Sequence, residues 1–247
     1  MPGKRGQPPA MRQVPELLKS HTDACSTLIN AAMEGQVRGV VMTFGVLGYG
    51  EHGEEWVDED TPWEPLGYGR FISAARDQLK HLAEYKRLPA TFLFPGWVYG
   101  NGGWFKDQLL PGLEQGQARL VGAGENYISF VHAEDLAEAY VLAAEQLGYA
   151  PMSDDRPVTQ MLNLVDDRPV TQKEWLSVVA QALGKPLPGS VSKEDCAKQA
   201  GELWAESITC SARVKNDRAK AALGWTLTHP TIKEGVPAAL DSIRKER

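Results

Sequence analysis

The chain has 247 residues, of which 43% are hydrophobic and 23% are charged, and it carries a formal net charge of −6 at pH 7. This composition is typical of a soluble globular protein, and the acidic balance argues against a nucleic-acid partner, which needs a basic face. No stretch approaches the roughly 20 consecutive apolar residues of a membrane-spanning helix. The three cysteines are far apart and the five histidines are scattered, so the sequence predicts neither disulfides nor a metal site and favours a reducing compartment.

Residues 1–20 contain several prolines and four basic side chains, which are Lys4, Arg5, Arg12 and Lys19. A secretory signal needs an apolar segment after its basic residues, and none follows here, so these residues are expected to form a flexible basic arm. The cytoplasm is therefore the expected compartment. An organelle matrix is the alternative if the basic arm serves as a presequence.

Residues 68–103 organise the chain as a helix, a strand and a loop. Apolar residues in the first half recur at the spacing of one helix face, which predicts an amphipathic helix that ends before Pro89. Residues 90–94 form a continuous apolar run, which is typical of a parallel strand buried on both faces. Because ligands of open α/β sheets bind at the carboxyl ends of the strands, the glycine-rich loop at residues 95–103 is the first place to expect a site.

The alternation of helix and strand patterns extends over residues 21–150, with further strands predicted at residues 37–43, 119–121 and 127–131. Residues 151–247 show mostly helical patterns instead, and several of these helices begin with a capping box. This change predicts an α/β domain followed by a small helical cap. Three tryptophans are expected to pack the cap on the domain: Trp175, Trp204 and Trp225.

The heptapeptide DDRPVTQ occurs twice, at residues 154–160 and 166–172. Two copies at so short a period do not make a solenoid, which favours a tandem duplication that lengthens a surface loop. The second copy ends in the pattern Thr171-x-x-Glu174, a capping box that predicts the start of a helix.

Five segments resemble, in the right order, motifs of the extended and atypical short-chain dehydrogenase/reductases. Residues 41–50 resemble TS-G-x-x-VYG, and residues 68–70 resemble the start of the Tyr-x-x-x-Lys helix. Residues 94–103 (FPGWVYGNGG) resemble the RPG-x-VYG-x-GG loop, residues 122–137 resemble GDGENxWSFVHVDDLA, and residues 212–225 resemble RVSSAKARRELGW. The chain is therefore identified as a member of the NAD-dependent epimerase/dehydratase group.

This resemblance implies an α/β fold, namely an incomplete Rossmann-type doubly wound parallel sheet with a small, mainly helical C-terminal cap. It divides the chain into a flexible arm (1–20), a partial Rossmann-like domain (21–150) and a cap or substrate region (151–247). It also implies NAD or NADP as cofactor, and a sugar nucleotide or another small carbonyl or alcohol compound as substrate. The implied cofactor-binding residues are Thr43, Phe44, Gly45, Tyr68, Pro95, Gly96, Trp97 and Val98, and the implied substrate-binding residues are Trp104, Phe105 and His132.

Three departures from the family pattern bear on the chemistry. The chain has no G-x-x-G-x-x-G loop, which in the family holds the pyrophosphate at a helix N-terminus, so the N-terminal Gly-rich half of the fold is expected to be missing. The catalytic Ser/Thr position is Gly45, and the lysine position, four residues after Tyr68, is Ile72. Since that lysine lowers the pKa of the tyrosine towards neutrality, Tyr68 is expected to stay protonated, as the one retained member of the catalytic triad.

Two classes of function follow from these residues. One is an oxidoreductase or isomerase of the epimerase/dehydratase type with a degraded triad. The alternative is a non-catalytic relative, either an accessory, regulatory or structural subunit or the product of a truncated gene. Without the preceding strands, the edge of the sheet near residues 37–43 is open, so a homo-oligomer or a partner chain that covers the sheet is expected.

Overall fold

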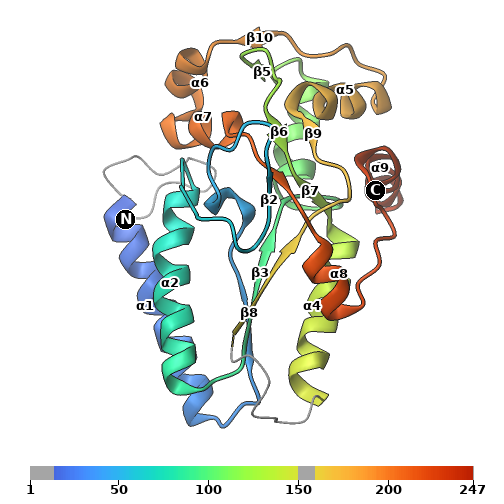
Figure 1. Cartoon of the computed structure of the whole chain (residues 1–247). Helices are drawn as coiled ribbons and strands as arrows, with labels where there is room; N and C mark the ends of the chain where they lie inside the picture. Colours follow the sequence, from blue (N-terminus) through green and yellow to red (C-terminus); the bar gives the residue numbers. More distant parts are fainter. Residues whose placement is uncertain (1–13, 150–158, 247) are drawn as a thin grey trace.

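The computed structural model describes residues 14–149 and 159–246, and its core is a three-stranded parallel sheet (Figure 1). The strands are β1 (Val40–Thr43), β3 (Ala90–Pro95) and β8 (Thr159–Leu164), in the spatial order β1-β3-β8. Every residue of the central strand β3 is buried, as its continuous apolar run predicts. In the register of the sheet, Phe92 lies between Met42 of β1 and Met161 of β8.

Helices cover both faces of this sheet. They are α1 (Val14–Glu34), α2 (Gly69–Lys86), α4 (Ala133–Tyr149) and α8 (Asp217–Leu223). Successive side chains of a strand point to opposite faces, so Phe92 and Phe94 pack against α1 and α2, whereas Leu93 packs against α4 and α8. Figure 1 shows α1 and α2 together on one side of the strands and α4 and α8 on the other. The layered α/β class implied by the resemblance is confirmed.

Four pairs of short strands extend the fold beyond the carboxyl ends of the sheet. The parallel pairs are β2 (Trp56–Val57) with β11 (Arg213–Val214), β4 (Trp97–Tyr99) with β7 (Phe130–His132) and β5 (Leu120–Val121) with β10 (Ser190–Val191), and β6 (Tyr127–Ile128) pairs antiparallel with β9 (Val170–Thr171). The pairs β2–β11, β5–β10 and β6–β9 each join a strand before residue 150 to one after residue 158. Backbone hydrogen bonds thus tie the C-terminal region to the α/β part.

The remaining elements are short helices that lie mostly in the C-terminal region. They are η2 (Val46–Gly48), η3 (Phe105–Leu109), α3 (Leu110–Glu114), α5 (Gln172–Ala182), α6 (Lys193–Ala200), α7 (Glu202–Thr209) and α9 (Ile232–Lys245). The predicted N-caps of α5 and α6 are present, because Thr171 Oγ1 accepts the Glu174 N–H at 3.1 Å and Ser192 Oγ accepts the Asp195 N–H at 3.0 Å. None of the described helices combines the length and apolar character needed to cross a bilayer.

Two segments differ from the sequence prediction. Residues 14–20, expected in the flexible arm, are the start of α1, and residues 1–13 lie outside the described part. Residues 159–164, expected in the cap, form β8 of the central sheet, because the apolar residues between the two DDRPVTQ copies are buried there. The first copy therefore runs into a core strand rather than a surface loop, although its residues 154–158 are outside the described part. Residue 150 is not the boundary between the sheet and the cap, and the division into two domains stays a prediction.

Candidate functional site

The two positions that should carry the hydroxyl and the ammonium of a catalytic triad do come together. Gly45, just before η2, is buried, and a Cβ atom built on it would lie 3.5 Å from Cδ1 of Ile72 and 3.7 Å from the carbonyl oxygen of Pro95. Both positions are set by the sheet, because β1 and β3 are adjacent and α2 packs beside them. The surface between these two positions is apolar, because neither Gly45 nor Ile72 carries a polar side-chain atom.

Tyr68 lies one helical turn before Ile72, at the N-terminal end of α2. Its backbone N–H donates to Oγ of Ser207 in α7 at 2.9 Å, and its ring centroid is 6.2 Å from that of Phe71. Burial of the half-exposed phenol raises its pKa above the ordinary value of tyrosine. The side chain therefore stays protonated near neutral pH, as expected, and it can donate a hydrogen bond but does not act readily as a base.

Thr43 and Phe44 face opposite sides of the sheet, as the alternation of a strand predicts. The Thr43 hydroxyl hydrogen-bonds to the hydroxyl of Tyr140 in α4. The Phe44 ring lies 5.5 Å from that of Phe92 and 5.8 Å from that of Phe94, on the face covered by α2. Thr43 consequently does not supply the hydroxyl that Gly45 lacks.

Residues 95–98, predicted as part of a loop, instead join the end of β3 to β4 through Gly96 alone. Gly96 donates its N–H to the Leu164 carbonyl and Trp97 donates its N–H to the Ser129 carbonyl, both at 2.9 Å. A Cβ atom on Gly96 would lie 2.4 Å from the Ser129 oxygen, so only glycine allows this approach of β3 and β4 to β7. The retained glycine is explained by packing within the chain.

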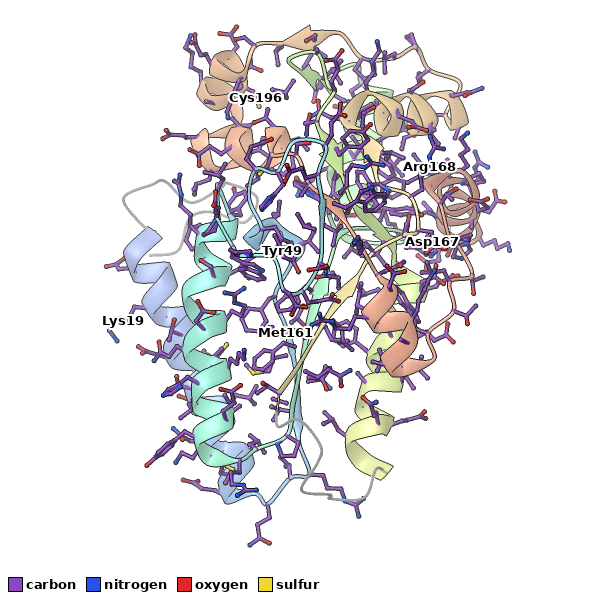
Figure 2. All side chains as sticks on the ribbon, viewed as in Figure 1. Lys19, Tyr49, Met161, Asp167, Arg168 and Cys196 are labelled. Carbon is purple, nitrogen blue, oxygen red and sulfur yellow. The ribbon has the colours of Figure 1, made fainter. Side chains whose placement is uncertain are left out.

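A small cavity and a larger one lie on either side of Trp97. The small one, about 20 Å³, is lined by Val46, Leu47 and Trp97, among others, and has room for about one water molecule. Trp97 contacts Trp104 and Trp204 edge to face, with centroids 5.6 and 5.5 Å apart. Both of these rings line the larger cavity of about 490 Å³, together with Gln108, Arg119, Cys196 and Gln199. Figure 2 labels Cys196 in this upper part of the molecule.

The three residues implied for substrate binding do not share a pocket. Trp104 lines the larger cavity. Phe105 is fully buried, with its ring 6.1 Å from that of Tyr99 and 5.8 Å from that of Trp175. His132 is buried beside a separate cavity of about 210 Å³. Sequence reasoning missed the polar lining of the larger cavity, because Gln108, Arg119 and Gln199 come from distant segments without a shared motif.

Sequence reasoning also missed a glycine spacing related to the dinucleotide fingerprint. Gly48, Gly50 and Gly53 follow β1 in the pattern G-x-G-x-x-G. Such a loop binds a pyrophosphate when a helix begins directly after it and its N–H groups point at the phosphates. Here the two-residue strand β2 follows, and the next α-helix begins only at Gly69.

The surroundings of these glycines do not fit a pyrophosphate. A Cβ atom on Gly48 would lie 2.1 Å from the Trp63 ring, and one on Gly50 would lie 1.8 Å from the Glu64 carbonyl oxygen. The N–H of Gly53 donates to a carboxylate oxygen of Glu51 at 3.0 Å, so this N–H is already bonded to an acidic side chain. Tyr49, between the glycines, is fully buried and donates to Asn163 Oδ1 at 2.9 Å (Figure 2).

Residues 6–151 match the model of the NAD dependent epimerase/dehydratase family. The chain belongs to this family. Since the matched residues include β1, α2, β3 and β4, the resemblance noted for these motifs is confirmed. The matched range also contains Gly45, Tyr68 and Ile72.

Individual relatives agree with this assignment. A 3-diazoavenalumate denitrifying reductase of a Streptomyces species is 28% identical over 222 residues, which are 87% of this chain and 69% of the reductase. A human epimerase family protein, SDR39U1, crystallised with NADPH, superimposes with a TM-score of 0.78 at 20% identity, covering 94% of this chain and 75% of that one. MoeE5 in complex with UDP-glucose and NAD gives 0.77 at 24% identity, covering 99% and 77%. The two solved structures support the fold.

Proposed function

We propose that this chain is a small-molecule-binding member of the epimerase/dehydratase family whose tyrosine-based hydride-transfer chemistry has been lost. The observation that carries the proposal is that Gly45 and Ile72, which hold the hydroxyl and lysine positions, are neighbours, since a Cβ atom built on Gly45 would lie 3.5 Å from Cδ1 of Ile72. A general base works best when its pKa lies near the working pH. At Tyr68, burial raises the pKa, and the isoleucine one turn later offers no positive charge to lower it.

The cofactor part of the proposal rests on the loop after β1. Gly48 is packed against Trp63 and Gly50 against Glu64, and the carboxylate of Glu51 accepts the N–H of Gly53. NAD and NADP carry a negatively charged pyrophosphate, which this carboxylate repels. The 247-residue chain is therefore expected to lack the pyrophosphate half of a dinucleotide site, and Pro95–Val98 and Tyr68 would contact only the nicotinamide end.

The first prediction is that the chain binds NAD⁺ and NADPH with dissociation constants of about 1 mM or weaker, equivalent to about 4 kcal/mol of binding free energy or less. The reason is that the pyrophosphate contributes little without a cradle of N–H groups. Isothermal titration calorimetry measures the constant directly, and tryptophan fluorescence, to which Trp97 contributes, gives a second readout. A dissociation constant in the low micromolar range would contradict the proposal.

The substrate part of the proposal rests on the larger cavity. Its volume, about 490 Å³, lies in the range of small-molecule pockets. The rings of Trp104 and Trp204 offer flat apolar walls, and exposed Arg119 supplies a positive charge. This combination suits a flat group joined to an anion, and it supports the sugar-nucleotide class over a simple carbonyl or alcohol compound.

An active reductase is the second candidate, and the similarity to the Streptomyces reductase over 87% of the chain favours it. Tyr68→Phe separates the two functions. If the chain reduces a carbonyl substrate at all, we expect Tyr68→Phe to lower the rate of that reduction less than about tenfold, because the phenol does not act as a base. A hundredfold loss or more, the usual size of general acid–base catalysis, would favour the reductase. Tyr85→Phe is the matched control, since Tyr85 is 79% exposed and far along α2.

We also propose that another chain covers the outer edge of the sheet, as a second copy or a different partner. Among the described residues, β1 pairs with β3 alone. Three apolar side chains that precede β1 in the chain are exposed: Leu28 (52%) and Met33 (38%) on α1, and Val37 (47%) after it. Unpaired strand edges beside apolar surface favour association. Sedimentation equilibrium at micromolar concentration is expected to show self-association, and a monomer with a cooperative melt well above about 60 °C would contradict this proposal.

A further inference from the structure

Three side chains with metal-binding atoms converge where β7 ends and α4 begins. They are His132, Glu134 and His229, and one ligand atom from each lies within 4.8 Å of the other two. The Nε2 atom of His229 is 3.0 Å from Oε2 of Glu134. The two imidazole rings lie with their centroids 4.0 Å apart at an angle of 53°. This cluster is separate from the Gly45–Tyr68–Ile72 region and takes no part in the proposed function.

The hydrogen bonds of His132 supply an independent observation. Its side chain is 2% exposed, and its buried Nε2 has no hydrogen-bond partner among the described residues. Its Nδ1 accepts the Glu134 N–H at 3.3 Å, which is longer than an ordinary hydrogen bond. Neither neutral tautomer satisfies both nitrogens here, and buried polar atoms without partners are rare. An ion bound at Nε2 would satisfy that atom. The ring proton would then lie on Nδ1, and the long contact with the Glu134 N–H would be lost.

The backbone around the cluster is held in place by a buried carboxylate. Asp135, which is 1% exposed, accepts the N–H groups of Thr228 and His229 at 2.7 and 2.9 Å. The indole N–H of Trp225 donates to the Asp135 carbonyl at 2.9 Å. These bonds fix the segment before α9 against the first turn of α4. The position of His229 beside His132 is therefore set by the fold and not by a mobile loop, which is the preorganisation that a metal site needs.

We propose that His132, Glu134 and His229 form a binding site for one divalent transition-metal ion of the zinc type. Two imidazoles and one carboxylate are a common ligand set for zinc, usually completed by a water molecule. Tetrahedral ligands at zinc distances stand about 3.3 Å apart, so the 3.0 Å pair is already near that spacing. Glu134 is exposed, so its carboxylate can adjust towards an ion, and the adjoining cavity of about 210 Å³, lined by Asn101 and Ser242, leaves space for the water.

The ion would link the segment before α9, through His229, to the end of β7 and the start of α4. Glu134 and His229 stand 95 positions apart in the sequence, and the segment between them contains the whole helical C-terminal region up to α9. A bond from each end to one metal closes this long loop and stabilises the folded state by mass action. The ligand set thus predicts a higher melting temperature with zinc than after treatment with a chelator.

Metal titration of the full chain tests the proposal. Chelator-treated protein is titrated with Zn²⁺ by calorimetry and with Co²⁺ by visible absorption, which reports tetrahedral coordination. We expect one ion per chain, and at least about a tenfold weaker affinity in Glu134→Gln and in His229→Asn, since even outer-shell changes produce losses of this size. His81→Asn is the matched control, because His81 is exposed on α2 and outside the cluster.

The outcomes separate a built site from adventitious binding. Weaker binding in both cluster variants, with wild-type affinity in His81→Asn, supports the proposal. Equal affinity in all four proteins, or no binding at about 100 μM metal, overturns it. Circular dichroism melts without metal check the fold of each variant. Should His229→Asn fail to fold, Glu134→Gln decides alone, because the Glu134 side chain is solvent-exposed and lies outside the core.

Discussion

Replacing Trp175 with alanine is expected to lower the free energy of unfolding by about 3–5 kcal/mol, the usual cost of deleting a buried large aromatic side chain. Trp175, on α5, is 3% exposed, and its ring stacks on that of Phe130 at 4.1 Å. It also contacts the rings of Tyr99, Trp104 and Phe105. These partners come from the α/β part, whereas α5 belongs to the C-terminal region, so the variant removes the centre of the interface between them.

Urea denaturation followed by circular dichroism measures this effect and also tests the division into domains. One transition with an unchanged m-value indicates that the two parts unfold together. A second transition, or a smaller m-value, indicates a cap that unfolds by itself. Trp56→Ala is the matched control, because Trp56 is 44% exposed and contacts mainly the guanidinium of Arg213. We expect it to change stability by about 1 kcal/mol or less, and an equal loss in both variants would contradict the assigned role of Trp175.

The elements with a strong local pattern were predictable from the sequence. The helix before Pro89 is α2, and the apolar run at residues 90–94 is β3, extended by Pro95. The predicted strand at residues 127–131 is instead divided at Ser129. The hydroxyl of Ser129 accepts the Val214 N–H and donates to the Ala212 carbonyl, so β6 and β7 take different partners on either side of it. A local pattern does not contain such long-range bonds.

The candidate sites were predictable only in part, for the same reason. The positions of Gly45 and Ile72 followed from the family motifs, and the structure brings them together. The expectation that no metal site exists rested on the spacing of histidines along the sequence. His132 and His229 meet only because Asp135 binds the segment before α9. Residues 159–164 were assigned to the cap because the surrounding repeat hid the pattern of a buried strand.

Gly50→Ala is expected to lower the free energy of unfolding by about 2–4 kcal/mol. A loss of this size would indicate that Gly50 serves the packing of the loop after β1. Gly50 has φ of 85°, a conformation that costs an alanine about 1 kcal/mol. Its Cβ would also lie 1.8 Å from the carbonyl oxygen of Glu64, with which Gly50 forms a parallel bridge. Overpacking against backbone adds about 1–3 kcal/mol, because a carbonyl cannot rotate out of the way as a side chain can.

Gly53→Ala is the control in the same loop. Gly53 also has positive φ, 55°, but a Cβ there would meet no atom within 4 Å, so only the conformational cost of about 1 kcal/mol is expected. The difference between the two variants in thermal or urea denaturation isolates the steric contact at Gly50. If the glycines formed a phosphate cradle instead, both substitutions would weaken dinucleotide binding and would affect stability alike. Equal stability of the two variants would therefore contradict the packing role of Gly50. A loss of NAD⁺ binding in both variants would contradict the proposed loss of the pyrophosphate site.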